Sequence, residues 1–358
     1  MGVRAVIGVF LLMACQSTEV RVVIDAPELL RPRVGAVRVE VFDDDDQSVL
    51  MATRMPNDTG WPVTALLEPR NGDRARGYRM EVRALAETGG ENDTLLWSEV
   101  VEADGYDSGV ETRNVLIGCT CDRPYAECVV NDGPAYYFRL EDGCSVSDEV
   151  GAVGAVARTN DAPCEGNENV QPVAGAVGMG LALLGMRGDG AAKVNPDPPN
   201  GLFQDSFSVE LWFRSLAVRD DGSRIGMFIY HTANPGAPSE GFELSEREGE
   251  VSLRGIDGTA TNAPINVRVA DMDARLQHFV LTVERIEGGG AATLYVDGVA
   301  QASGPYPGTF DPTDDGEFGG HRGRSSGGEY DELAVYTRAL TPNEVLNHWL
   351  VGRDGCPR

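Results

Sequence analysis

An Asp-Gly pair, Asp297-Gly298, follows two segments in which apolar and polar residues alternate, at positions 276–283 and 292–296. Both segments are rich in Val, Leu, Thr, Phe and Tyr, as strands are. Asp-Gly suits a two-residue hairpin turn, because both central residues of that turn adopt positive φ. The sequence therefore predicts an antiparallel hairpin that turns at Asp297-Gly298. The 44 Gly and 20 Pro residues fall between short apolar runs, which extends the all-β expectation to the rest of the chain.

The segment after residue 340 carries the signals of a helix. Thr341 is a suitable N-cap, Pro342 fits the first helical position, and Glu344 completes a capping box. A helix is therefore expected from Pro342 to about Leu350, with Gly352 just past its end.

Taken together, residues 276–352 resemble the concanavalin-like jelly roll of laminin-G-like domains. The resemblance rests on Leu276-Gln277-His278-Phe279-Val280, Leu294-Tyr295-Val296-Asp297-Gly298 and Tyr330-Asp331-Glu332-Leu333-Ala334-Val335-Tyr336. Upstream segments at 136–142, 183–190 and 207–213 follow in the order that this family shows, so the resemblance covers about 134–352. It implies a concanavalin-like jelly-roll sandwich. It leaves the function open, because the fold hosts lectins, adhesion modules, hydrolases and lyases.

A smaller domain is expected before the jelly roll. Alternating segments occur at 20–24, 36–42, 77–85 and 110–117. Their length and spacing predict a small immunoglobulin/fibronectin-like β-sandwich over residues 20–118. Residues 119–133 then form a Cys-rich connector, and residues 353–358 a C-terminal tail that contains Cys356.

Residues 1–14 predict a signal peptide. Arg4 is followed by about ten apolar residues, the length of a signal-peptide core and too short to span a bilayer. The segment ends in Leu12-Met13-Ala14-Cys15, which resembles a bacterial lipobox. That resemblance implies a lipid on Cys15, a short tether over residues 15–19, and an outer-membrane lipoprotein of the cell envelope, since Gln16 rather than Asp follows the cysteine. An ordinary signal peptide with a chance cysteine is the alternative.

The remaining cysteines are even in number: Cys119, Cys121, Cys128, Cys144, Cys164 and Cys356. In an exported chain they predict three disulfides. The jelly-roll resemblance puts Cys144 and Cys164 in one early loop, where we expect them to pair. It also brings the first and last strands together, so Cys356 is expected to reach the 119–128 cluster. A zinc site in that cluster is the alternative, and the Cys-x-Cys spacing disfavours it.

The formal net charge of −26 argues against nucleic acid and anionic membrane surfaces as partners. The same charge would attract Ca²⁺. In related jelly rolls an Asp on the last strand and backbone carbonyls hold a structural calcium, and the resemblance assigns this role to Asp331. The carbonyls would come from residues 134–136 and 188–190. The alternative is that Asp331 only bonds neighbouring backbone.

Binding is favoured over catalysis. Some enzymes of this fold carry three carboxylates at alternate positions of one strand. Glu329 and Asp331 would be two of them, but the third position is occupied by Leu333. The four histidines lack metal-ligand spacing, and His278 matches a family position expected to be structural. We therefore predict a non-catalytic module that binds carbohydrate or protein for adhesion or recognition. The candidate loop residues are Tyr230, His231, Tyr306, Phe310, Arg322 and Arg324. A polysaccharide-degrading hydrolase or lyase and a purely structural envelope protein are the alternatives.

Overall fold

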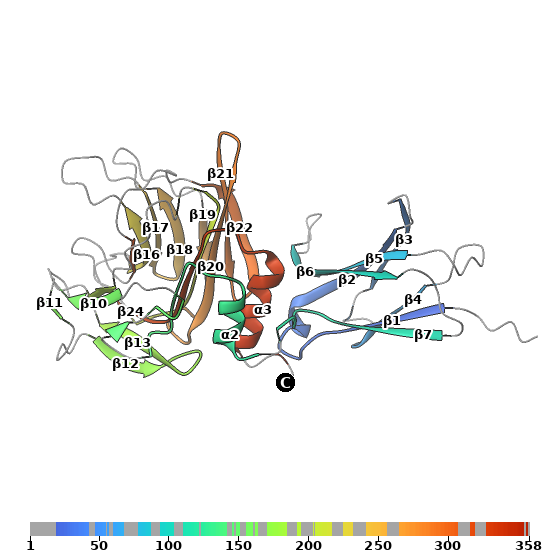
Figure 1. The fold of residues 1–358 in the computed structure, drawn as a ribbon, viewed down its shortest axis with the longest axis horizontal. Helices are drawn as coiled ribbons and strands as arrows, with labels where there is room; N and C mark the ends of the chain where they lie inside the picture. The colour runs from blue at the N-terminus through green and yellow to red at the C-terminus, as the bar shows by residue number, and fades with distance from the viewer. Residues whose placement is uncertain are drawn as a thin grey trace, which may run out of the picture. The chain divides into compact units, whose positions relative to one another are not determined.

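The computed structural model describes residues 19–42, 47–54, 56, 60–67, 78–86, 94–103, 110–121, 123–141, 145–146, 148–150, 155–159, 162–163, 170–184, 192–194, 203, 205–216, 225–231, 241–255, 265–306, 316–318, 327–353 and 356. These residues fall into two compact units (Figure 1). One is built mainly from residues before 118 and the other mainly from residues 118 onward, with the described residues of the segments 27–32 and 94–97 grouped with the second. No helix in the described ranges is long and apolar enough to cross a membrane.

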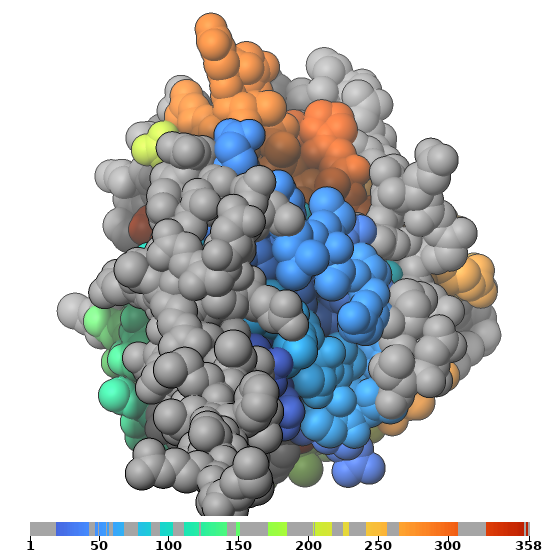
Figure 2. All heavy atoms as spheres, turned by 90° about the vertical axis from the view of Figure 1, so that its right-hand side faces the viewer, coloured from blue at the N-terminus to red at the C-terminus, as the bar shows by residue number. Residues whose placement is uncertain are grey.

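The first unit is a small β-sandwich. One sheet has the order β4 (Val63–Leu67), β1 (Glu19–Asp25), β7 (Val110–Leu116), and the other β3 (Ser48–Arg54), β2 (Val34–Phe42), β5 (Tyr78–Ala86), β6 (Leu95–Ala103), with the 3-10 helix η1 (Arg31–Arg33) before β2. Alternate side chains such as Val20, Val22 and Ile24 are buried, as the sequence pattern predicts for strands with one face against a core. Atoms of strands β1 to β5 are coloured in shades of blue in Figure 2.

The predicted sandwich is confirmed for this unit, and its strand order differs from that of an immunoglobulin constant domain. In that fold the first strand shares a sheet with the second. Here β1 pairs with β4 and, in parallel, with β7, while β2 pairs with β3 and β5. Alternation along each strand sets which face is buried, and it does not say which strands are neighbours.

The second unit is a larger sandwich of two sheets. Among the described residues, the first sheet has the order β12 (Val170–Ala174), β13 (Met179–Leu184), β24 (Gly327–Tyr336), β15 (Phe207–Ser215), β20 (Gln277–Ile286), β21 (Gly289–Val296), β22 (Val299–Pro305), with β8 (Tyr136–Phe138) beside β24. The second has the order β11 (Ala162–Pro163), β10 (Ala155–Thr159), β14 (Ala192–Val194), β23 (Gly316–Phe318), β16 (Ile225–His231), β17 (Gly241–Arg247), β18 (Glu250–Gly255), β19 (Ile265–Arg268), with β9 (Ser145–Val146) beside β10.

The core of this unit lies between its two sheets. Strand β15 sends Val209, Leu211 and Phe213 into this core, all at most 1% exposed. The side chains between them, at Glu210 and Trp212, leave the sheet on its other face, because successive side chains of a strand point to opposite sides. That other face is also buried, and helices α2 (Tyr125–Asn131) and α3 (Pro342–Gly352) contact it.

The predicted hairpin and helix are both present. Asp297 and Gly298 have φ of 51° and 79° in the turn between β21 and β22. A Cβ on Gly298 would lie 3.0 Å from Leu346 and 3.2 Å from Trp349, so this glycine also lets α3 approach the turn. Helix α3 begins after Thr341, whose side chain forms the capping box with Glu344. The helix ends at Gly352, two residues later than expected. Helix α2 was not anticipated in the Cys-rich connector, because seven residues are too few to show a helical period.

Two disulfides join cysteines of the predicted set. Cys119 bonds Cys356, and Cys121 bonds Cys128. The expectation that Cys356 reaches the 119–128 cluster is confirmed. The zinc alternative is wrong for this cluster, since all its sulfur atoms are used in disulfides. Cys144 and Cys164, the pair expected in the early loop, lie outside the described residues.

Replacing Cys119 and Cys356 together by Ser should destabilise the second unit more than replacing Cys121 and Cys128. The first bridge joins residues 237 positions apart and the second joins residues 7 apart. In the chain-entropy model the longer loop restricts the unfolded chain by roughly 3 kcal/mol more. Urea unfolding of the two double variants, followed by Trp fluorescence, provides the comparison. Equal losses would contradict the expectation.

Candidate functional site

A buried carboxylate occupies the outer face of β15. The Glu210 side chain is fully buried and accepts hydrogen bonds from the Tyr125 hydroxyl at 2.7 Å, His278 Nε2 at 2.8 Å and the Tyr336 hydroxyl at 2.8 Å. The Trp212 indole N–H donates to the Tyr125 hydroxyl at 3.2 Å. A buried charge is tolerated only when such partners surround it, so Glu210 requires α2, β20 and β24 in their observed places.

His348 of α3 completes this arrangement. Its Nδ1 donates to Glu210 Oε2 at 3.0 Å, and its Nε2 donates to Asp132 Oδ2 at 2.8 Å. Burial alone would raise the pKa of Glu210, but the charge of His348 and the hydrogen bond from His278 outweigh it and hold that pKa well below its ordinary value. Burial would lower the pKa of His348, whereas the charge of Glu210 and the bond to Asp132 raise it to about 10. Glu210 and His348 therefore form a buried ion pair at neutral pH.

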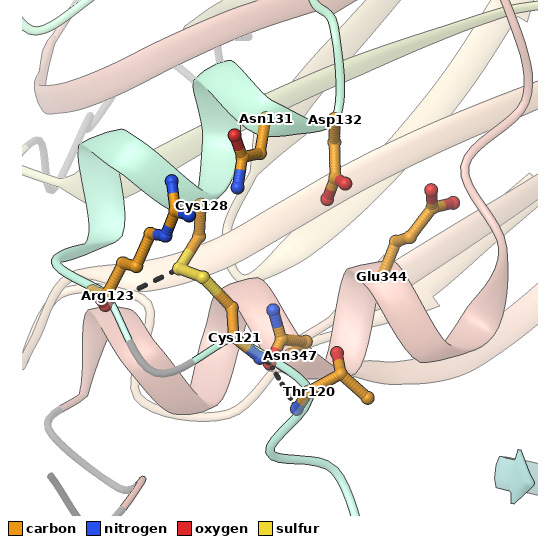
Figure 3. A pocket seen from close by; sticks show the side chains of 8 residues that line it. All are labelled: Thr120, Cys121, Arg123, Cys128, Asn131, Asp132, Glu344 and Asn347. Carbon is orange, nitrogen blue, oxygen red and sulfur yellow. Dashed lines mark hydrogen bonds between the residues drawn. A yellow bond between two sulfur atoms is a disulfide. The ribbon is translucent and has the colours of Figure 1, made fainter.

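A polar cavity of about 280 Å³ lies beside this network (Figure 3). Its lining residues are Thr120, Cys121, Arg123, Cys128, Asn131, Asp132, Glu344 and Asn347. Three of them precede α2 in the Cys-rich connector, two belong to α2, Asp132 directly follows α2, and the last two belong to α3. The Asp132 side chain is 27% exposed, so it belongs both to the cavity and to the hydrogen-bond network behind it.

A second buried acidic pair results from a β-bulge in β24. The register between β15 and β24 shifts at this point, and Glu332 has a φ of 51°. Tyr330 and Leu333 both point into the core, so Asp331 and Glu332 leave the sheet on the same outer face. A regular strand would have put them on opposite faces.

Burial dominates the electrostatics of this pair. Burial raises the pKa of Asp331 to about 7, although backbone N–H donors including that of Val177 act in the opposite direction. Burial and the charge of Asp331 raise the pKa of Glu332 to about 9, against the hydrogen bond from the Tyr137 hydroxyl and the charge of Arg139. Both acids are therefore bonded by groups of the protein, and their burial favours the protonated forms.

Whether Asp331 can hold a cation depends on which of its two carboxylate oxygens is free of hydrogen bonds. Oδ2 accepts the Val177 N–H at 3.0 Å, while Oδ1 is buried without a hydrogen-bond partner in the described part of the chain. One oxygen is thus available to a cation. The carbonyls expected at 188–190 lie outside the described residues, and within the described ranges no group of three or more His, Cys, Asp or Glu is arranged to hold a metal. Calcium at Asp331 stays a prediction.

The loop candidates from the sequence do not line the cavity where the structure describes them. Tyr306 is only 8% exposed, and its ring centroid lies 5.7 Å from that of Phe207 and 5.9 Å from that of Phe242. Tyr306 is a core residue in this structure, which corrects its assignment as a ligand contact. Tyr230 and His231 lie in β16, and their side chains are outside the described set, as are Phe310, Arg322 and Arg324.

Sequence reasoning missed Glu210, His348 and the cavity residues Asn131 and Asp132. A signal for Glu210 was present, since it is a charged residue in the middle of the apolar strand Phe207–Ser215. Asn131 and Asp132 gave none, because polar residues near a helix end are usually ordinary surface residues.

The match to a protein family falls within the second unit. Residues 187–346 match the sequence model of the concanavalin A-like lectin/glucanases superfamily. This part of the chain is a concanavalin A-like domain. No curated protein matches the chain.

Solved structures with a similar fold include two toxin binding domains and one domain of an arabinanase. The binding domain of Paraclostridial Mosquitocidal Protein 1 has a TM-score of 0.45 at 16% identity, covering 62% of this chain and 52% of that chain. Domain 4 of AbnA, an extracellular arabinanase from Geobacillus stearothermophilus in complex with arabinotriose, has a TM-score of 0.44 at 18% identity. The match covers 60% of this chain and 97% of that chain. The receptor binding domain of botulinum neurotoxin type G has a TM-score of 0.41 at 14% identity. The match covers 60% of this chain and 50% of that chain. This chain thus spans about half of the two toxin chains.

The stability of the concanavalin A-like domain should depend on pH through His348. Its folded pKa of about 10 lies above its ordinary value of 6.5, so its contribution is fully present below pH 6.5 and is lost as pH rises through about 10. His348→Gln should lower the free energy of unfolding by about 3–5 kcal/mol near pH 6, because it leaves the buried Glu210 without its ion-pair partner. The loss should shrink toward pH 10.

Urea unfolding of wild type and His348→Gln across this pH range measures the difference. The raised pKa values of Asp331 and Glu332 also make the folded state less stable as pH rises. Both residues are present in both proteins, so their effect cancels in the difference between wild type and variant. The groups that face His348 are Glu210 on β15, Asp132 after α2, Tyr125 on α2, His278 on β20 and Tyr336 on β24. Glu284→Gln, at an exposed position of β20, is the control and should follow the wild type. A difference that does not change with pH would disprove the buried ion pair.

Proposed function

We propose that this chain is a non-catalytic binding protein whose concanavalin A-like domain recognises a carbohydrate. The match of residues 187–346 to a superfamily described by lectins and glucanases supports this proposal, since both classes act on carbohydrates. Fold alone does not decide between binding and cleavage, so the choice rests on the carboxylates.

The observation that carries the non-catalytic assignment is the inaccessibility of the most perturbed acids. A glycosidase needs two carboxyl groups that reach opposite sides of the scissile bond. In the described part of the domain, Glu210, Asp331 and Glu332 have the most strongly shifted carboxyl pKa values, and all three are 0% exposed. Their partners are groups of the protein itself. Their altered acidity therefore serves the fold, and no substrate reaches them in this structure.

Purified full-length protein should retain glycans on an array and release no reducing ends from polysaccharides. Arg322→Ala and Arg324→Ala should weaken retention at an unchanged melting temperature if the loop candidates contact the ligand. Tyr306→Ala serves as the contrast, because truncating this core ring should cost about 3–5 kcal/mol of stability. Turnover of a polysaccharide that disappears with one carboxylate substitution would overturn the proposal, and retention of proteins alone would move it to a protein ligand.

We further propose that Cys15 carries a lipid that holds the protein at the outer membrane. The support is the Leu12–Cys15 sequence and the even number of cysteines that remains without Cys15. Labelled palmitate should enter the wild type and not the variant Cys15→Ser, which should appear in the soluble fraction. Cys121→Ser, which removes a disulfide sulfur, should keep the label and controls for thiol chemistry. Labelled Cys15→Ser would refute the anchor.

Calcium at Asp331 is proposed as a structural ion of the same domain. An ion that binds only the folded state raises the melting temperature with the logarithm of its free concentration. Chelation should therefore lower the melting temperature of the wild type and leave that of Asp331→Asn unchanged. Glu329→Gln, on the same strand, should respond like the wild type, because Arg214 already pairs with Glu329. Equal responses in wild type and Asp331→Asn would exclude Asp331 as a ligand.

A further inference from the structure

Several polar groups at the cavity beside α2 and α3 are oriented by the protein but not fully used by it. The Asn347 side chain accepts the Thr120 and Cys121 N–H groups at its Oδ1, at 3.0 and 3.1 Å. Its amide nitrogen is directed away from that backbone and toward the cavity (Figure 3). Asn347 is 3% exposed, so its orientation is fixed by packing as well as by these two bonds.

Asp132 is oriented in a comparable way. Its Oδ2 accepts from His348 at 2.8 Å, and no described residue bonds Oδ1. Figure 3 shows the Asp132 carboxylate and the Asn131 amide extending from the end of α2 toward the same space. The Glu344 carboxylate, by contrast, already accepts hydrogen bonds from Arg338 at 2.7 and 2.9 Å and from the N-cap of α3.

The charges around the cavity balance. The two carboxylates nearest to it, Asp132 and Glu344, are bonded to His348 and Arg338. Buried Glu210 shares the same His348. His348 carries one positive charge but is bonded to two carboxylates, those of Asp132 and Glu210. The positive charge of Arg123, at the rim of the cavity, offsets the remaining negative charge. A ligand with a strong net charge of either sign therefore gains little here, whereas a neutral ligand with many hydroxyl groups meets an acceptor and amide groups already in place.

The wall of the cavity is also rigid. The Cys121–Cys128 disulfide ties the segment before α2 to the helix, and the Cys119–Cys356 disulfide ties that segment to the residues after α3. A site that is fixed before the ligand arrives avoids the cost of ordering its side chains. Its volume of about 280 Å³ lies just below the roughly 300–1,000 Å³ that is usual for ligand pockets, so it is suited to one small molecule.

We propose that this cavity binds a single unit of a neutral sugar, with Asp132 accepting a hydrogen bond from one hydroxyl and the amides of Asn131 and Asn347 bonding its neighbours. The proposal rests on the carbohydrate-binding function proposed above and gives it a location away from the predicted loops. It does not depend on calcium or on the lipid anchor.

The test is saturation-transfer NMR on the full chain with glucose, galactose, mannose and arabinose as probes, and with glycine and sulfate as zwitterionic and anionic comparisons. At least one sugar should bind, while glycine and sulfate should not. Asn131→Ala should weaken the sugar by about tenfold, the effect of one lost hydrogen bond. Its melting temperature should not change, since the Asn131 side chain is exposed. Gln301→Ala, an exposed side chain on β22 that bonds only its own strand, should bind like the wild type.

The outcomes separate the two proposals. Binding that Asn131→Ala leaves intact and Arg322→Ala abolishes would overturn the cavity assignment and keep the carbohydrate-binding function. Binding of glycine or sulfate in place of sugars would overturn the neutral ligand. Failure of wild type to bind any of the four sugars would overturn the cavity proposal, and glycan-array retention by the same sample would show that the broader function survives.

Discussion

The ion pair between Glu210 and His348 is the interaction on which the outer face of the concanavalin A-like domain depends. A charged carboxylate with no exposed surface needs several donors at once, and here these come from α2, β20, β24 and α3. Displacing α3 would remove the charged partner His348, and displacing α2 would remove the Tyr125 donor. The two short helices are therefore held by polar contacts as well as by packing, and the cavity between them takes its shape from the same contacts.

The same face shows how a local irregularity changes the chemistry of a strand. In a regular β24, Asp331 and Glu332 would lie on opposite sides, and one of them would point into the apolar core. The bulge at Glu332 turns both outward, where Val177 and Tyr137 bond them. The irregular backbone thus keeps a carboxylate out of the core, and the high pKa values of the two acids follow mainly from their burial.

The sequence predicted the fold better than the site, and the reason is physical. The hairpin at Asp297-Gly298 and the cap at Thr341 depend on residues that are neighbours in the chain, so their patterns can be read directly. That Cys356 reaches the 119–128 cluster followed from the expected closeness of the first and last strands, but its partner Cys119 became known only from the structure. The cavity combines Thr120, Asp132 and Asn347, which only the packed helices bring together. Tyr306 lies just after a strand, yet its ring turns back into the core, and periodicity does not report such a turn.

The Cys119–Cys356 disulfide has a mechanical consequence. A pulling force applied at the two ends of the chain enters the domain at Cys119 and leaves it at Cys356, which a covalent bond joins directly. The tension passes through the sulfur atoms and does not load the strands and helices between these two positions. While this bond is intact, the sheets, the buried ion pair and the cavity stay unstrained under a load that would extend the chain on either side.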